Sequence, residues 1–201
     1  MNKTSQKGFT LYELMITLTI VGVVSAIGVP NMIEYSQNSR MTGTANDLHA
    51  AFHFARSEAS RAKTFITLCA SANSMTATPS CSGDWDDGYI VFLDQDGDIT
   101  VDGGDTILRQ MPAMPDGVFM NVVGDAKYFG FAGSGLGRGQ VGAATPLSQV
   151  VLCDKRANGV AAGGNSAARL FVVTPMGRAT IQRDLSMIQE VLDDNGSFAC
   201  E

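Results

Sequence analysis

Charged side chains are scarce in this sequence, and they are almost missing from its first thirty residues. Asp, Glu, Lys and Arg make up 17% of the chain, whereas about 25% is usual for a soluble protein. Phe9 to Val29 covers 21 residues, and Glu13 is the only charged one among them. A helix of that length spans roughly the 30 Å hydrocarbon core of a bilayer. The scarcity of charge therefore predicts a transmembrane helix near the N-terminus.

Closely spaced cysteine pairs are also missing from the sequence. The four cysteines follow the apolar segment, and no two of them form a C-x-x-C pair. Zinc sites and thioredoxin-like motifs use that spacing, so two disulfides in an oxidising compartment are the expected use of these cysteines. Of the three possible pairings we favour Cys69–Cys81, which closes a short loop rich in Ser, Thr and Pro, and Cys153–Cys200, which ties down the C-terminus.

Common catalytic motifs are not found. In "GFAGSGLGRG", Ala132 occupies the first glycine position of a G-x-S-x-G motif around Ser134, and no G-K-[ST] of a phosphate loop follows. A general base would have to be His49, His53 or a surface carboxylate. The two histidines are four residues apart, a spacing that can place both on one metal ion, but no third ligand lies nearby. We predict a packed or surface histidine pair, and a protein that is not an enzyme.

Basic residues are fewer than acidic ones. The net charge is −6, and because Lys3 and Lys7 precede Gly8, the chain after Gly8 carries 12 basic and 20 acidic residues. An acidic body of this kind repels nucleic acid on average. The 201 residues leave room for one globular domain after the apolar segment.

The residues before the apolar segment are short and polar, and they differ from a secretory signal peptide. "MNKTSQKG" contains two lysines and ends in Gly8, and no A-x-A-like cleavage site follows the apolar segment. Composition alone predicts an uncleaved signal anchor, with Lys3 and Lys7 on the cytoplasmic side and the rest of the chain outside.

The segment "KGFTLYELMITLTIVGVVSAIGVPNMIEY" resembles the class III signal of type IV prepilins and type II secretion pseudopilins. Gly8 precedes the cleavage point, and Phe9 becomes the new N-terminus. Counted with Phe9 as the first residue, Glu13 is the fifth and Pro30 the twenty-second. Tyr12 departs from the pattern, because a branched aliphatic residue is commoner there. The resemblance implies that a prepilin peptidase cuts between Gly8 and Phe9 and methylates the new amine on Phe9.

Glu13 gains a physical role from this resemblance. A carboxylate within a membrane is costly unless it is paired. The N-terminal ammonium of a neighbouring subunit would be a suitable partner when the helices bundle with a stagger. The alternative is a carboxylate that lies in water at the membrane interface.

The helix is expected to continue past the apolar segment. Pro30 removes one backbone hydrogen bond and should kink the helix without ending it. Apolar residues then recur at steps of four and three, which is typical of a helix with one buried face. This stripe comprises Met41, Ala45, Leu48, Phe52, Ala55, Ala59 and Ala62. We predict one long helix over residues 9–63.

After Lys63 the pattern changes to period two, with β-branched and aromatic residues between turns. Strands are predicted in "TFITLCA", "GYIVFLD", "TILRQM", "GVFMNVV", "KYFGF", "SQVVLC", "RLFVVT" and "RATIQR", whereas residues 184–192 fit a short helix or an edge strand. The predicted fold class is α+β, with antiparallel sheets on the long helix. The expected organisation is a leader at 1–8, a transmembrane and filament-core helix at 9–30, an amphipathic second half at 31–63 and a β-rich domain at 64–201.

Later blocks strengthen the resemblance. "LHAAFHFARSEASRAK" is similar to the "ARSEA" helix of FimT/GspH-type minor pilins and pseudopilins, and 88–109 and "TPMGR" resemble strand signatures of that family. The resemblance implies a low-abundance subunit that primes or caps a filament. Its expected partners are major and minor pilins, the prepilin peptidase and an inner-membrane assembly platform. It would be anchored in the inner membrane with a periplasmic domain, then join an extracellular pilus or a periplasmic pseudopilus.

An acidic loop is a candidate calcium site. "DQDGDITVDGGD" has carboxylates at positions 1, 3, 5, 9 and 12 of a possible calcium loop, with the Thr100 carbonyl at position 7. Ile99 occupies position 6, where glycine is usual, and flanking EF-hand helices are not predicted. A solvated acidic turn is the alternative interpretation. The candidate ligands are Asp94, Asp96, Asp98, Asp102 and Asp105.

Some FimT-type pilins that take up DNA carry a C-terminal G-R-x-R loop. Gly177 and Arg178 match its start, but Thr180 replaces the second arginine. Arg178 and Arg183, with Arg169, are candidates for a small DNA-binding patch. The acidic balance of the chain argues against nucleic acid as a partner.

Overall fold

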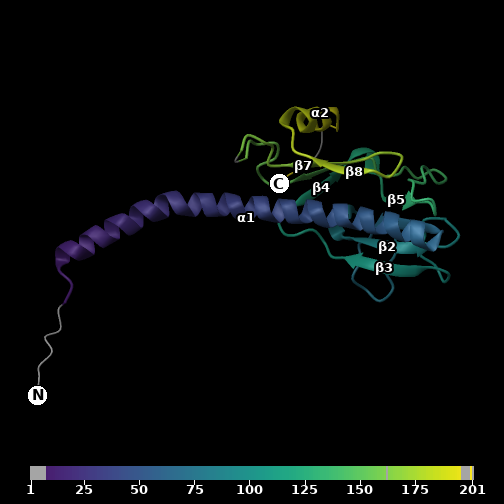
Figure 1. Ribbon diagram of the computed structural model, residues 1–201, viewed down its shortest axis with the longest axis horizontal. Helices are drawn as coiled ribbons and strands as arrows, with labels where there is room; N and C mark the ends of the chain where they lie inside the picture. Colours follow the sequence, from purple (N-terminus) through teal and green to yellow (C-terminus); the bar gives the residue numbers. More distant parts are fainter. Residues whose placement is uncertain (1–7, 162, 196–199, 201) are drawn as a thin grey trace, which may run out of the picture. The chain divides into compact units, whose positions relative to one another are not determined.

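The computed structural model describes residues 8–161, 163–195 and 200. The chain divides into two units, Met1–Ser39 and Arg40–Glu201, which are described separately. Helix α1, Leu11–Ala62, contributes residues to both units and continues through Pro30 without ending (Figure 1). The prediction of one long helix over 9–63 is therefore confirmed to within two residues at each end.

In the first unit, the side chains of α1 are exposed except those of Glu34, Gln37 and Asn38, which are half-buried. The most apolar window of α1 has a mean hydropathy of 1.9 and no buried residue, so by length and composition this helix could cross a membrane. Thr17 and Thr19 donate their hydroxyls to the Leu14 and Met15 carbonyls at 2.9 and 2.8 Å. Their polar groups are thus satisfied inside the helix, as an apolar surrounding requires.

The described residues of the second unit form eight strands in two antiparallel sheets. The first sheet has the order β3-β2-β1-β5 and the second the order β4-β6-β7-β8 (Figure 1). The strands are β1 (Phe65–Ala70), β2 (Tyr89–Asp94), β3 (Thr106–Met111), β4 (Phe119–Val122), β5 (Tyr128–Phe131), β6 (Gln149–Cys153), β7 (Arg169–Val173) and β8 (Ala179–Gln182). All eight predicted strands and the α+β class are confirmed.

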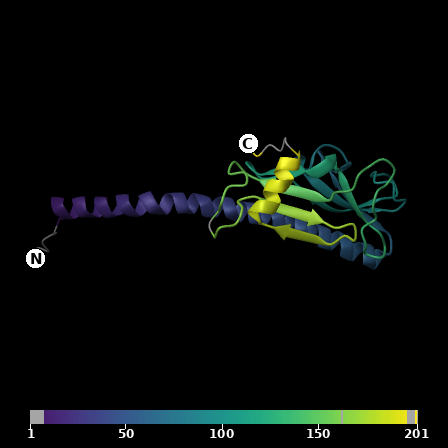
Figure 2. The ribbon, with the colours of Figure 1, turned by 90° about the horizontal axis from the view of Figure 1, so that it is seen from above.

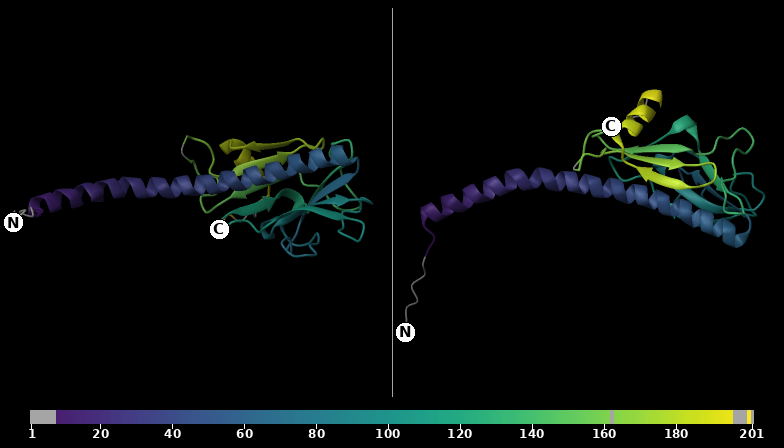
Figure 3. Two further views of the ribbon diagram at one scale, coloured as in Figure 1. Left: turned by 60° about the horizontal axis from the view of Figure 1, so that its bottom comes forward. Right: turned by 45° about the horizontal axis from the view of Figure 1, so that its top comes forward.

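The second half of α1 packs against both sheets to form the main core (Figure 3). Phe52 is buried, and its ring lies 5.2 Å from that of Phe129 in the first sheet and 5.1 Å from that of Phe171 in the second. The buried residues of α1 are Met41, Thr44, Ala45, Leu48, Ala51, Phe52, Ala55 and Ala59. The predicted stripe is correct except for Ala62, which is exposed because the helix ends there.

Helix α1 ends because the residue after it has a left-handed backbone conformation. Lys63 has φ of 56° and donates its N–H to the Ala59 carbonyl at 2.9 Å, which is a common way to end a helix. Gly133 passes this turn so closely that a Cβ would lie 2.5 Å from the Lys63 carbonyl carbon. Glycine is therefore required at residue 133.

Alternate residues of the second sheet face different cores. Val150 and Leu152 face the main core, whereas Val151 and Cys153 belong to a second cluster with Ile188. This second cluster is covered by α2, Leu185–Asn195, which lies across the strands in Figure 2. The segment that the sequence left undecided is therefore a helix.

Both predicted disulfides are confirmed. Cys69 is bonded to Cys81, and Cys153 is bonded to Cys200. The first joins β1 to the loop that follows it, and the second joins β6 to residue 200 beside α2.

Candidate functional site

The predicted cleavage point lies just before α1. Phe9 is 90% exposed, and α1 begins two residues later at Leu11. Gly8 has no atom within 4 Å of the place where a Cβ would be. The fold itself therefore has no steric need for glycine at residue 8. Residues 1–7 of the predicted leader, including Lys3 and Lys7, lie outside the described residues.

The Glu13 carboxylate caps the start of its own helix. Its Oε2 accepts hydrogen bonds from the Thr10 N–H at 2.8 Å and the Thr10 hydroxyl at 3.0 Å, and the Glu13 N–H donates to Thr10 Oγ1 at 3.2 Å. This reciprocal pattern is a capping box. Sequence reasoning missed it, although "TLYE" carries the T-x-x-E signature. Glu13 thus has a partner within its own chain.

An exposed apolar surface follows Glu13 on α1. The exposed large apolar side chains from there to the middle of the helix are Leu14, Met15, Ile16, Leu18, Ile20, Val21, Val23, Val24, Ile27, Val29, Met32 and Ile33. Beyond Pro30, Asn31 donates its side-chain amide to the Ile27 carbonyl at 2.9 Å. The segment therefore presents carbon atoms outward on all sides, which suits either lipid or the apolar helices of other subunits.

An exposed apolar helix that continues into an antiparallel α+β domain is the architecture of pilin-like subunits. The sequence profile described as "Type II transport protein GspH" matches residues 44–177, and that of the "Prokaryotic N-terminal methylation motif" matches residues 3–29. The chain belongs to the GspH family. This family and its fold are those of structural pilins and pseudopilins.

Pilin sequences and one solved pilin structure are also similar to parts of this chain. A fimbrial protein of Pseudomonas aeruginosa is 39% identical over 46 residues, covering 23% of this chain and 30% of that protein. The type IV major fimbrial protein FimA of Dichelobacter nodosus is 44% identical over 52 residues, covering 24% and 33%. The chain thus matches about a third of the length of these relatives. The crystal structure of the P. aeruginosa type IV minor pilin FimU is similar, with a TM-score of 0.50 at 16% identity, covering 74% of this chain and 92% of that one.

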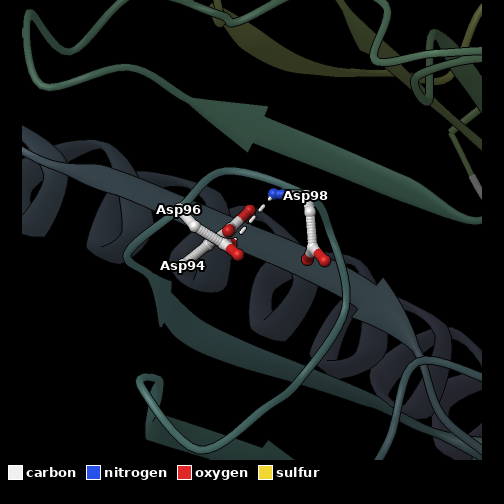
Figure 4. A group of neighbouring side chains, drawn as sticks. All are labelled: Asp94, Asp96 and Asp98. Carbon is white, nitrogen blue, oxygen red and sulfur yellow. Dashed lines mark hydrogen bonds between the residues drawn. The ribbon is translucent and has the colours of Figure 1, made fainter.

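The acidic loop gathers three of its five predicted ligands. Among the described residues, the carboxylates of Asp94, Asp96 and Asp98 form a group whose oxygens lie within 4.8 Å of one another (Figure 4). The dashed line in Figure 4 is the bond from the Asp98 N–H to Asp96 Oδ1. Asp105 instead accepts the N–H groups of Gln95 and Asp102 at 2.9 and 3.2 Å. Its carboxylate therefore stabilises the turn next to the group of three.

Asp94 differs from its neighbours because it is completely buried. Its carboxylate accepts hydrogen bonds from Arg138 Nη1 at 3.0 Å, the Thr67 hydroxyl at 2.7 Å and the Gly97 N–H at 2.7 Å. Asp96 and Asp98 are exposed. Arg138 already balances the Asp94 charge, so a cation here would meet mainly the other two carboxylates. Calcium binding stays a prediction, which a melting experiment would test: an unchanged midpoint at millimolar calcium would remove the site.

One of the three candidate DNA-binding arginines is buried, so the three do not form a surface patch together. Arg178 is exposed at the turn between β7 and β8, whereas Arg169 is only 2% exposed. Arg169 donates from Nη1 to the Ala167 carbonyl at 2.8 Å, and burial lowers its pKa to about 10, with Arg183 and Arg156 adding to the effect. Including Arg169 in a surface patch was wrong, because its guanidinium is used inside the fold. DNA contact through Arg178 and half-buried Arg183 stays a prediction.

The two histidines lie side by side on α1. His53 Nε2 is 3.2 Å from His49 Nε2, and His49 Nε2 is 3.2 Å from the Ala179 carbonyl oxygen. His53 is exposed, and His49 packs at 6.3 Å from the Phe171 ring. The pKa of His53 is lowered from its ordinary value, first by partial desolvation and then by the neighbouring His49 and Arg56. The pair is thus a neighbouring surface pair, as the sequence favoured.

Proposed function

We propose that this chain is a minor pilin, a low-abundance structural subunit that primes or caps a type IV pilus. The observation that supports this most is the single carboxylate, Glu13, which lies at the start of an exposed apolar helix and is the fifth residue after the Gly8–Phe9 bond. The α+β domain would make the specific contacts with other minor subunits. The chain would be held in the inner membrane before assembly.

Assembly would exchange the partner of Glu13. In the free chain, Thr10 satisfies the carboxylate through the capping box. After cleavage and methylation, the Phe9 amine of a neighbouring, staggered subunit would offer a positive charge at the same height along the helix bundle as the Glu13 carboxylate. A charged pair away from water is stronger than a bond to a neutral hydroxyl. The exchange therefore favours the bundled state over the single subunit.

Replacement of Glu13 tests this proposal. Glu13→Ala is expected to insert in the membrane normally, because the apolar surface is unchanged, and to be depleted from sheared filaments. Glu34→Ala, which removes the next carboxylate on α1, is the matched control and should be incorporated like the wild type. Immunoblots of membranes and of filaments give both quantities. Normal incorporation of Glu13→Ala would refute the role of this carboxylate.

Gly8 allows a separate test of processing. A Cβ at residue 8 meets open space in this chain, so Gly8→Val should leave the fold intact. If a prepilin peptidase requires the glycine, this variant keeps its leader. Mass spectrometry of the wild type from sheared filaments should show a methylated Phe9 as the first residue. A mature protein that begins beyond Pro30 would overturn the proposal.

A type II secretion pseudopilin is the second candidate function, and the description of the matching family favours it. The same helix physics would then build a shorter periplasmic filament. A deletion strain separates the two candidates. Loss of surface pili and twitching supports the first, and loss of exoprotein secretion supports the second.

A further inference from the structure

His49 and His53 bring their ring nitrogens together on one side of α1. They are four residues apart, the spacing at which two imidazoles on one helix face can hold a single metal ion. Their Nε2 atoms are 3.2 Å apart. Two nitrogen ligands bound tetrahedrally to zinc, each at about 2.0–2.1 Å, lie about 3.3 Å from one another. The two nitrogens therefore already have the separation of two ligands on one ion.

A backbone oxygen adds a third donor that the sequence did not reveal. The Ala179 carbonyl oxygen lies 3.2 Å from His49 Nε2. Ala179 begins β8, which is the last strand of its sheet. The Arg178 carbonyl accepts the Thr174 N–H across the turn at 3.0 Å. Carbonyls alternate in direction along a strand, so the Ala179 carbonyl points away from β7 and meets α1 instead.

Hydrogen bonds satisfy this group of three atoms poorly. Each nitrogen of a neutral imidazole carries either one hydrogen or one lone pair. If His49 Nε2 carries the hydrogen, that single hydrogen is shared between the Ala179 oxygen and His53 Nε2. If it carries the lone pair, it faces the lone pairs of the Ala179 oxygen. A metal ion accepts electron pairs from both nitrogens and from the oxygen, so it removes this conflict.

The donor atoms select the class of ion. Imidazole suits zinc, copper and nickel, whereas calcium and magnesium prefer oxygen ligands. His53 is exposed and His49 is half-buried, so an ion can reach the nitrogens from water and can keep water in its remaining position. Arg56 brings a positive charge to His53, and this charge would oppose a bound cation.

We propose that His49 and His53, with the Ala179 carbonyl oxygen, bind one divalent transition-metal ion such as zinc. The ion would link α1 to the edge strand β8 and so stabilise the contact between the helix and the second sheet. All three residues lie within the second unit. The proposal therefore does not depend on whether the chain joins a pilus or a pseudopilus.

Titration of the full chain with zinc tests the site. The chain is kept in detergent, carries no polyhistidine tag and is first stripped of metal with a chelator. Calorimetry should find one zinc ion per chain, and zinc should raise the melting midpoint, because a ligand that binds the folded state stabilises it. No binding at submillimolar zinc would overturn the inference.

His53→Gln is the diagnostic variant, because His53 is exposed and its replacement should leave the fold intact. An unchanged far-ultraviolet circular dichroism spectrum of the metal-free variant checks this. Zinc affinity should fall by about a hundredfold, the smaller of the gains expected when two binding groups act together. An unchanged affinity would show that the ion binds elsewhere.

Two control variants keep both histidines. Arg56→Gln removes the opposing charge on the same helix, so it should bind zinc at least as tightly as the wild type. Asp96→Asn changes the acidic loop and should leave zinc binding unchanged. Weaker binding by Arg56→Gln, or binding that depends on Asp96 and not on His53, would overturn the assignment.

X-ray absorption at the zinc edge identifies the ligands directly. The spectrum of the zinc-loaded chain should show two imidazoles, with oxygen in the remaining positions. One imidazole should be lost from the spectrum of His53→Gln. A site made of oxygen ligands alone would contradict the proposal.

Discussion

Asp94 holds a carboxylate at a position with no solvent exposure, and Arg138 supplies the compensating cation. The Arg138 side chain is 13% exposed, and its guanidinium also lies over the Phe65 ring, 4.3 Å from the centroid. The spacing of the carboxylates predicted that Asp94 is a metal ligand. The sequence does not reveal that Arg138, 44 positions later, pairs with it. The acidic loop is therefore anchored to the core at its first residue.

Removal of Arg138 is predicted to be strongly destabilising. Arg138→Ala leaves Asp94 buried without its cation, which typically costs about 3–5 kcal/mol. Lys127→Ala is the matched surface control, because Lys127 pairs with exposed Asp84 and Asp125, and such pairs contribute about 0–1 kcal/mol. Thermal unfolding of the full chain in detergent should separate the two variants by several degrees. Equal midpoints would contradict a buried charge at Asp94.

His53 makes a pH-dependent contribution to stability. Its lowered pKa in the folded chain means that the unfolded chain binds the proton more readily. The free energy of unfolding should therefore fall as the pH drops below about 6.5, the ordinary histidine value, and continue to fall until the folded pKa is passed. His53→Gln should lose less stability than the wild type between pH 7.5 and 5.5, as measured by melting midpoints. Identical losses would show that His53 titrates alike in both states.

Among the elements, α1 was the most predictable and α2 the least. The stripe of α1 repeats over six turns, so periodicity identified its buried face, although Thr44 and Ala51 on the same face were missed. In α2 only Ile188 and Val191 are buried, and two apolar positions fit several patterns. Its helical state depends on Asp184, which accepts the N–H groups of Ser186 and Met187 at 2.9 and 3.1 Å. The hydrogen bond from the Ser186 hydroxyl lowers the pKa of Asp184 most, and the bonds from the Met187 and Ser186 N–H groups add to the effect.

The two disulfides should differ in their contribution to stability. Cys153 and Cys200 are 47 positions apart, whereas Cys69 and Cys81 are 12 apart. In the chain-entropy model the longer loop is worth about 4 kcal/mol and the shorter about 3 kcal/mol. The double variant Cys153→Ala/Cys200→Ala should therefore melt lower than Cys69→Ala/Cys81→Ala. The reverse order would indicate that local packing at Cys69, and not loop entropy, decides the difference.

For the whole molecule, the sequence predicted the fold class, the strands and the disulfide pairing, because these follow from local patterns and loop lengths. It did not predict contacts between distant residues, such as the pairing of Arg138 with Asp94. The predicted cleavage point precedes a helix start that the capping box of Thr10 and Glu13 explains. The T-x-x-E signature of that box is present in the sequence as "TLYE".

The division of the chain leads to a prediction about truncation. A chain that begins at Arg40 keeps the buried residues of α1, including Phe52, and should be folded and soluble without detergent. A chain that begins at Thr64 lacks them and exposes the inner faces of both sheets, so it should aggregate. Circular dichroism and size-exclusion chromatography distinguish the two. A well-folded product from Thr64 onward would show that α1 is dispensable for the core.

The internal bonds of Thr17 and Thr19 affect how neighbouring apolar helices can be aligned. Because both hydroxyls are committed to carbonyls of their own helix, neither is needed to fix one helix against the next. Dispersion contacts between aliphatic side chains are individually weak, about 0.1–0.2 kcal/mol for each pair of atoms, so no single contact selects one alignment of two helices. The axial alignment of neighbouring helices would then depend on the Glu13 carboxylate alone. A filament could tolerate many substitutions of one apolar residue by another along the helix. It would still lose its order if this carboxylate were moved by one helical turn.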